Sequence, residues 1–498
     1  MELQFEKKAC RCLRRNVWEV KDQEQKQEVK LPEGMPDIGN ILAAWGQCVM
    51  RGKEWRSDGM GVSGGVMAWV LYAPADGSEP RSVEVWLPMQ TKWSFPDSLR
   101  EGTIRASWLL KGVDARTLSA RKMMVRANVG VLGEALEPCE EEISTADQVP
   151  EDVQLLKNTY PARLPLEAGE KTFAIDEEFS FPVSESTPEK LISCCFSPQL
   201  TEQKVLGGKA VFRGVGNFHM LYQGTDGQLH SWDQEVSFSQ FSDLDRDYDK
   251  DAQISVIMAL SSLEPELQDG RIRLKCGIIA QYLISDIIVL ELIEDAYSPN
   301  RQVSIEARGL RLPMVLDSSQ ETMRFDSTIP ENASRVVDVA VCPEQPTLRR
   351  AGDLTELECN GQCQVLFYDE NGALQGRCAR WSQVWELPAS MDADVLGVVQ
   401  TVSRPQASAN AGQISLNGEL QAEAMTVSQQ GMPMVTGLEL GEMTRPDPGR
   451  PSLILRRAGE GSLWEIAKDT GSTVSAIRKA NGLNDEPLDD RLLLIPVS

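Results

Sequence analysis

The sequence predicts a mainly β protein, with three repeated β-sandwich or barrel-like domains followed by a small α+β module of βααβ order. Apolar and polar residues alternate at period two in "RKMMVRANVGV" from Arg121 and "RIRLKCGIIAQYLI" from Arg271, which is typical of strands. Turn signals follow apolar runs at "DG" from Asp76 and Asp226 and at "NG" from Asn371. Near the C-terminus the apolar spacing changes to that of helices, which predicts the module.

The three turn signals occur at the same position within a longer shared pattern, and this pattern predicts that the chain contains repeats. An aromatic residue lies five positions before each turn glycine, in the pairs Tyr72 and Gly77, Tyr222 and Gly227, and Phe367 and Gly372. The next alternating strand begins 49 residues after the aromatic residue in the first two copies, and about four residues sooner in the third. We therefore infer three copies of one β-domain, spaced by about 150 residues.

Proline-bearing stretches precede the copies, at "VKLPEGMPDIGNIL" from Val29, "FSFPVSESTPEKLI" from Phe179 and "MRFDSTIPENASRVV" from Met323. Linker-like segments follow at 137–152, which is acidic, and at 444–451. The predicted domains are residues 1–150, 151–318, 319–446 and 451–498. A repeat of this length is too long for a solenoid unit, so each copy is expected to have its own core.

Composition limits the compartment and the partners. The chain has 50 Lys and Arg against 74 Asp and Glu, a net charge of -24, which disfavours nucleic acid and anionic lipid as partners. We predict no integral membrane segment, because about 18 consecutive apolar residues occur nowhere. The charged opening lacks the apolar stretch of a secretory signal, and the 11 cysteines follow no disulfide spacing. These features predict a soluble, unexported chain with reduced thiols.

No catalytic residue, cofactor-binding residue or metal ligand is predicted, and no cofactor is expected. The stretch "GVSGG" matches a nucleophile elbow around Ser63, but it leads into a strand, and His219 and His230 are the only histidines. A hydrolase using Ser63 remains a third alternative. The acidic run "DLDRDYDKD" has Tyr248 where a calcium loop needs glycine, and the cysteine spacings do not suit zinc.

The C-terminal module carries its own boundary signals. Ser462 and Glu465 form an S-x-x-E capping box that predicts a helix start, and Gly471 predicts its end. A second helix is expected to begin near Ser472 or Thr473 and to end at "NG" from Asn481. Short strands are predicted at "SLILR" and "RLLLIP" on either side.

This module resembles the LysM family. The residues that carry the resemblance are Leu463, Trp464, Ile466, Ala467, Ile477, Asn481, Leu483, Ile495 and Pro496. The resemblance implies a shallow groove for N-acetylglucosamine glycans between two loops, with the candidate residues Gly459, Glu460, Gly461, Ser462, Leu463, Gly482, Leu483, Asn484 and Asp485. In "GEGSL" the first loop is one residue longer than in the family. We therefore favour a protein ligand over a glycan, while a purely structural role stays open.

The whole chain resembles the SPOCS-domain family of spore coat morphogenesis proteins of spore-forming Firmicutes, of the SipL type. The repeats followed by a LysM module carry this resemblance, together with "LPEGMPDIGNIL" and "LSARKMMVRANV". It implies a non-enzymatic scaffold in the mother-cell cytoplasm, at the outer forespore surface. The implied partners are coat basement-layer proteins, especially the self-assembling coat ATPase, with LysM contributing a protein contact. The alternative is a protein that binds peptidoglycan or cortex glycan.

Overall fold

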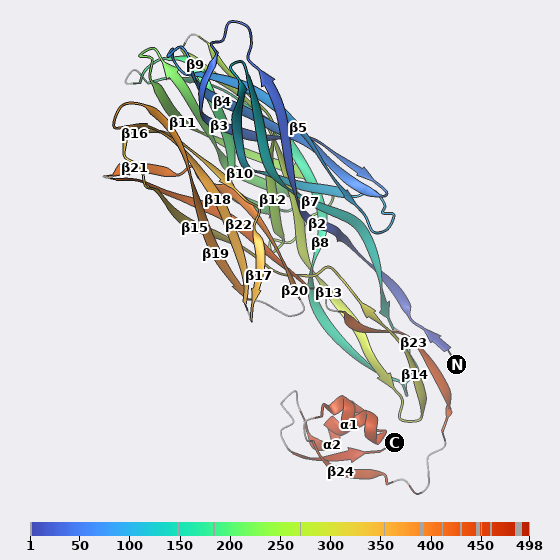
Figure 1. The fold of residues 1–498 in the computed structure, drawn as a ribbon. Coiled ribbons are helices and arrows are strands. Elements are labelled where there is room, and N and C mark those ends of the chain that lie inside the picture. The colour runs from blue at the N-terminus through green and yellow to red at the C-terminus, as the bar shows by residue number, and fades with distance from the viewer. Residues whose placement is uncertain are drawn as a thin grey trace.

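Long antiparallel strands make up almost all of the computed structural model, and two short helices lie near the C-terminus (Figure 1). This confirms the predicted mainly β class. The structure describes residues 2–146, 149–182, 185–268, 270–352, 354–388, 393–410, 412–428, 431–444, 449, 451–458, 461–483 and 491–497.

The first unit is a two-layer sandwich of six strands. One sheet has the order β3-β4-β5 and the other β2-β7-β6. A single apolar cluster, with residues from both sheets such as Val70 and Val129, fills the space between the layers. The strands are β2 (Glu6–Lys30), β3 (Ile38–Arg56), β4 (Gly59–Pro74), β5 (Arg81–Ser94), β6 (Thr103–Ser119) and β7 (Lys122–Thr145).

The second unit has the same strand order as the first. Its sheets are β9-β10-β11 and β8-β13-β12, so the first strand again pairs with the last and the middle strands form the other sheet. Its strands are β8 (Gln154–Ser180), β9 (Pro188–Leu206), β10 (Lys209–Gly224), β11 (Leu229–Asp243), β12 (Gln253–Gln268) and β13 (Arg271–Tyr297).

The third unit follows this order with two interrupted strands. Both β16 and β17 pair with β18, and both β20 and β21 pair with β22, so two strands of the other units are each replaced by two shorter ones. Its strands are β15 (Val315–Ile329), β16 (Ala333–Pro343), β17 (Thr347–Ala351), β18 (Leu354–Asp369), β19 (Leu374–Pro388), β20 (Ala393–Val402), β21 (Gln406–Asn410) and β22 (Gln413–Ser428).

The three predicted hairpin turns are confirmed at equivalent places in the units. Gly77, Gly227 and Gly372 have φ angles of 76°, 75° and 75°, a backbone conformation that glycine adopts without strain. The aromatic residue five positions earlier is buried in the central strand each time. The hydroxyl of Tyr72 also donates to the carbonyl of Pro36, 2.9 Å away, and so ties the proline-bearing loop to the sandwich.

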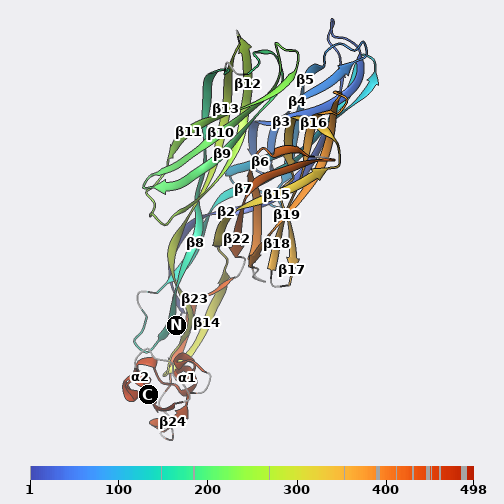
Figure 2. The same ribbon diagram turned by 90° about the vertical axis from the view of Figure 1, so that its left-hand side faces the viewer.

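A narrow extension below the units, which we call the stem, is built from strands of the first two units and from the strands that flank the third. Its core contains Cys12, Ile143, Leu164, Leu292 and Met434, which come from distant parts of the sequence. It comprises residues 6–15, 136–145, 154–164 and 286–297 of β2, β7, β8 and β13, together with β1 (Glu2–Gln4), β14 (Arg301–Leu310) and β23 (Met432–Met443). Figures 1 and 2 show these segments side by side.

The three units, which together we call the body, do not have fully separate cores. The apolar cluster of the second unit also contains Trp45 and Trp69 of the first unit and Val337 and Leu366 of the third. Each unit has a core of its own, as expected, but the core of the second unit extends into both neighbours. Such large apolar side chains are stabilised here by contacts between units, which link the units into one body.

A buried charge network also joins the first two units. Arg105 is 2% exposed and Glu134 is 0% exposed, and their side chains form an ion pair at 3.1 Å. Glu134 also accepts from Arg15 at 2.7 Å, while Arg105 donates to the hydroxyl of Ser255 in the second unit at 3.1 Å. Because every charge has a partner, the burial is tolerated.

Candidate functional site

The C-terminal module forms from the local signals that the sequence carries. Its elements are β24 (Leu453–Arg457), α1 (Leu463–Thr470), α2 (Val474–Asn481) and β25 (Leu492–Pro496), which confirms the predicted βααβ order. The capping box is present, since Ser462 accepts from the backbone of Glu465 and the Glu465 side chain accepts from the backbone of Ser462. Gly471 and Gly482 end the helices in left-handed conformations.

Asn481 connects the second helix to the closing strand. Its amide group donates to the carbonyl oxygens of Ile477 at 2.8 Å and Leu494 at 2.6 Å, and its side-chain oxygen accepts from the backbone of Leu494 at 2.7 Å. This explains why an asparagine suits the end of α2. The module's core consists of Ala458, Ile466, Ala467, Ile477, Leu493 and Ile495, together with Tyr297 of the stem.

The nine predicted groove residues fall into two sets. Gly459, Glu460, Asn484 and Asp485 lie outside the described residues. In the other set, Ser462 and Gly482 are exposed, and Gly461 is half-buried. Leu463 and Leu483 are also half-buried, and both of these residues from the two predicted loops pack against the module's core.

The helical side of the module lies against the lower end of β13. Trp464 donates from Nε1 to Asp295 at 2.7 Å, and Lys468, one turn later on the same helix face, forms an ion pair with Asp295 at 2.8 Å. The Tyr297 hydroxyl donates to the carbonyl of Ser472 at 3.0 Å, and its ring meets Trp464 edge to face. The sequence analysis did not identify this contact.

The charge of Asp295 is stabilised at this contact. Burial alone would raise the pKa of Asp295, but hydrogen bonds from Lys468 and Trp464 outweigh it and lower the pKa. The signal that could have indicated the contact is the i, i+4 spacing of Trp464 and Lys468. That spacing does not identify the stem residue opposite them.

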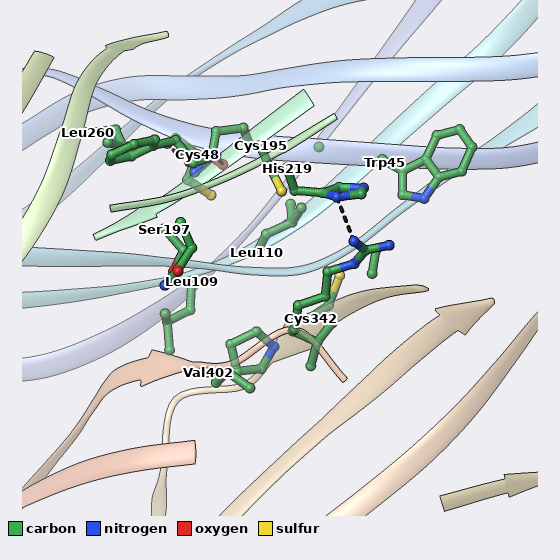
Figure 3. Close-up of a pocket in the computed structure, with 18 of the residues that line it drawn as sticks. Trp45, Cys48, Leu109, Leu110, Cys195, Ser197, His219, Leu260, Cys342 and Val402 are labelled. Atoms are coloured by element: carbon green, nitrogen blue, oxygen red, sulfur yellow. Dashed lines mark hydrogen bonds between the residues drawn. The ribbon is translucent and has the colours of Figure 1, made fainter. Parts of the chain in front are cut away.

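A second polar site, which the sequence did not indicate, lies where the three units meet. A cavity of about 270 Å³ is lined by residues of each unit. Among the lining residues labelled in Figure 3 are Trp45, Cys48, Cys195, His219 and Cys342. The three thiols are almost entirely protonated near neutral pH, because burial raises each of their pKa values. Across the described residues, no cluster of His, Cys, Asp and Glu forms a candidate metal site.

Four charged groups join the second and third units beside this cavity. His219 lies 2.9 Å from Asp233 through Nδ1 and 3.0 Å from Asp338 through Nε2. Arg404 of the third unit forms ion pairs with Asp233 at 2.6 Å and with Asp338 at 2.5 Å. Its guanidinium is also 2.7 Å from His219 Nδ1, the contact that is dashed in Figure 3. Two carboxylates therefore contact both Arg404 and His219.

These contacts shift the pKa values of the cluster. Burial alone would lower the pKa of His219, but Asp338 and Asp233 outweigh it and raise the pKa. Burial would raise the pKa of Asp338, yet His219 and Arg404 lower it to about 2. The carboxylates therefore favour the protonated form of the imidazole, and the two basic side chains favour ionised carboxylates, which fits a structural junction between units.

Ser63, the candidate nucleophile of the third alternative, lies inside β4. Its hydroxyl donates to the carbonyl of Gly52 on β3 at 3.3 Å. The described hydrogen bonds and ion pairs connect His219 to Asp233, Asp338 and Arg404, and His230 to Asp226, and neither histidine to Ser63.

A family model described as SipL, SPOCS domain, matches residues 188–264. The matched segment begins at the first residue of β9 and ends within β12, so it lies wholly in the second unit. No curated protein and no solved structure matches the chain. Both described helices have eight residues, and no described helix could span a membrane.

Proposed function

We propose that this chain is a non-enzymatic scaffold of the spore coat, which binds other coat morphogenetic proteins at the forespore surface. The observation that carries the proposal is the similarity of the second unit to the SPOCS domain of SipL, in a chain whose six-strand order occurs three times. The similarity indicates a sporulation-related protein. The proposed partners are basement-layer proteins of the coat, especially the self-assembling coat ATPase.

The construction of the body supports a scaffold. Three similar units are joined by shared apolar clusters and by buried ion pairs, so their outer surfaces are held in fixed relative positions. Weak contacts made simultaneously by linked surfaces gain avidity without needing strong individual sites. A scaffold with several attachment points benefits from such rigidity because the geometry of simultaneous binding is already set.

The absence of enzymatic activity is part of the proposal. The Ser63 hydroxyl contacts a backbone carbonyl, and His219 is held by two carboxylates and an arginine that join units. These contacts favour structural roles for the residues that sequence motifs singled out. We place the protein in the mother-cell cytoplasm, at the outer forespore surface.

The C-terminal module is proposed to contribute a protein contact. It resembles LysM, and it lies at the lower end of the stem, far from the top of the units (Figure 1). This position makes it available to a partner that does not touch the units. In the LysM-like module, the longer first loop favours a protein over a sugar as the ligand.

The test uses a fluorescently tagged full-length chain in sporulating cells. A ring around the forespore is expected, whereas uniform staining of the vegetative wall would contradict the proposal. For the module, Ile466→Asp places a charge in its buried core, and Ser475→Asp, at an exposed position of α2, is the matched control. Recovery of coat proteins with the tagged chain should fall for the first variant only.

Binding of peptidoglycan or cortex glycan is the second candidate function. It is favoured by the intact capping box and by the exposure of Ser462 and Gly482 in the two loops where LysM modules bind sugar. Co-sedimentation of the full chain with peptidoglycan at moderate salt separates the candidates. A groove binder pellets and loses this property in Gly461→Gln but not in the control Ser475→Gln, whereas a protein-binding module stays in solution.

A further inference from the structure

Two cysteine side chains meet in the stem. The pairing register places Cys12 of β2 directly opposite Cys139 of β7, and their Sγ atoms lie 3.1 Å apart. Both are free thiols in the structure. Among the strand pairings of the described residues, this is the only place where two cysteines lie directly opposite one another. The pair connects two positions that are 127 residues apart in the sequence.

The strand geometry at this pair suits a disulfide bond. Residues directly opposite one another on antiparallel strands have Cα atoms about 4.5–5.5 Å apart, and disulfides span Cα separations of about 4.4–6.8 Å. The two side chains also project to the same face, where Cys12 belongs to the apolar core of the stem and Cys139 packs against it. Because the two thiols are already in contact, a sulfur–sulfur bond requires no movement of either strand.

The two thiols differ in their access to solvent and in how readily they ionise. Cys12 is 4% exposed, whereas Cys139 is half-buried. A hydrogen bond from the Cys12 thiol lowers the pKa of Cys139, because it stabilises a thiolate there, and the same hydrogen bond raises the pKa of Cys12. The charge of Arg14 also favours the thiolate of Cys139. Cys139 is therefore the more accessible and more nucleophilic of the two thiols.

We propose that Cys12 and Cys139 form an oxidative modification site, at which hydrogen peroxide converts the two thiols into a disulfide that links β2 to β7. In the first step, the Cys139 thiolate attacks one peroxide oxygen, the O–O bond breaks, and Cys139 becomes a sulfenic acid while hydroxide leaves. The Cys12 sulfur then attacks the Cys139 sulfur and loses its proton, and the sulfenic oxygen leaves as water. The two thiols lose two electrons and two protons, and the peroxide is reduced to two molecules of water.

The neighbouring cysteine on the same strand does not compete for this bond. Cys10 lies two residues before Cys12 on the same face of β2, but the residue opposite it is Glu141. Its side chain is 5% exposed, and burial raises its pKa, so it is neither accessible nor readily ionised. The strand register therefore sets the pairing of Cys139 with Cys12, and Cys10 provides a matched control.

The disulfide fastens the N-terminal part of the stem. Residues 6–15 of β2 are held to β7 by the strand pairing and by exposed ion pairs such as that of Arg11 with Glu140. The new bond fixes this pairing covalently, and cross-links that close long loops restrict the unfolded chain most. We therefore expect the oxidised chain to unfold at a midpoint about 5 °C higher than the reduced chain. This inference does not depend on the proposed scaffold function.

The test treats the purified full-length chain with hydrogen peroxide and maps its cysteine linkages by mass spectrometry without reduction. We expect a peptide pair joined through Cys12 and Cys139 and a higher unfolding midpoint, both reversed by dithiothreitol. Cys139→Ser should abolish the linked pair, whereas the control Cys10→Ser should keep it. Because the linkage is read in the unsubstituted chain, the result does not depend on how either variant folds. No linked pair, or an equal yield of Cys139 linked to another cysteine, would overturn the inference, and an unchanged midpoint would contradict the fastening of the stem.

The order of the two chemical steps has its own readout. At neutral pH, iodoacetamide should alkylate Cys139 about tenfold faster than Cys12, because alkylation needs an accessible thiolate. In Cys12→Ser the sulfenic acid on Cys139 has no thiol to attack it, so a dimedone probe should label Cys139 after peroxide treatment. Faster alkylation of Cys12, or no labelling of Cys139 in this variant, would show that Cys139 is not the thiol that reacts first.

Discussion

The body and the C-terminal module are attached to their neighbours in different ways. Units of the body share apolar clusters and ion pairs between almost fully buried groups, such as Arg105 and Glu134. The module contacts the stem mainly through Asp295 and Tyr297, and the charged group of Lys468 at that contact is partly exposed. We therefore expect the body to behave as one piece, and the module to separate from the stem more easily than the units separate from one another.

This contrast has a simple energetic basis. A buried ion pair leaves an uncompensated charge in a medium of low polarity when one partner is removed, whereas solvent compensates most of the loss at an exposed pair. Substitutions in the body should therefore affect the stability of several strands at once. Substitutions at the contact between module and stem should change the position of the module more than the stability of the body.

The largest effect is expected for Glu134→Ala. The change leaves Arg105 buried without its carboxylate and also removes the partner of Arg15, so it should destabilise the body by about 3–5 kcal/mol. Urea unfolding followed by circular dichroism measures this. Glu140→Ala, on the same strand but paired with Arg11 at the surface, is the control and should cost less than about 1 kcal/mol. Equal losses would contradict the role assigned to the buried network.

The second effect is a pH dependence of the junction between the second and third units. The pKa of His219 is higher in the folded chain than in the unfolded chain. Its contribution to the free energy of unfolding is therefore fully present below the unfolded pKa of about 6.5, and it is lost as the pH rises through the raised folded pKa. Asp338 contributes above its unfolded pKa of about 3.9, and that part is lost as pH falls toward 2.

Thermal unfolding at a series of pH values measures the His219 contribution. The groups that face His219 are Asp233 on β11, Asp338 on β16 and Arg404 after β20, while Cys195 lies opposite it on β9. The pKa of Cys195 is raised to about 12, so this thiol does not titrate in the same window. His219→Gln should remove the fall in midpoint above pH 6.5. A variant with an unchanged pH profile would contradict the assignment.

A smaller effect is expected inside the module. Ser462→Ala removes the cap of α1 and should destabilise the module by about 1 kcal/mol, without changing the body. Hydrogen exchange of the α1 amides should speed up about fivefold, which corresponds to that energy. The exposed Lys479 lies inside α2, away from its cap, so Lys479→Ala serves as the control. Faster exchange throughout the body would show that the module and body are not separable.

The smallest effect on stability is expected for Asp295→Asn. It weakens the hydrogen bond with Trp464 and removes the ion pair with Lys468, so the module should leave the stem while the unfolding midpoint of the body stays the same. Small-angle scattering should show a larger maximum dimension. Glu291→Gln, which breaks an exposed pair with Lys157 on the same strand, should leave it unchanged. A large loss of body stability in Asp295→Asn would contradict the expectation that the module is attached more weakly than the units of the body.

The sequence by itself determined the features that depend on neighbouring residues. Period-two alternation predicted the strands, the turn glycines predicted the hairpins that carry Gly77, Gly227 and Gly372, and the capping box predicted the start of α1 at Leu463. Each of these signals lies within a few residues of the structure it specifies. For this reason the predicted groove loops could be located along the chain, although the ligand that binds them could not be identified.

Only the tertiary structure decided which distant residues meet. The stem combines strands from both ends and the middle of the chain. Asp338, His219 and Arg404 lie in three different segments of the chain and meet at one junction. Asp295 likewise meets Trp464 and Lys468 across more than 160 residues. Many acidic residues along the chain look alike in sequence. Which of them gains a partner depends on how whole sheets pack, so the sequence does not indicate it. The apolar pattern of β24 predicted a strand, but only the packing of α1 and α2 on one side revealed that its outer leucines remain uncovered.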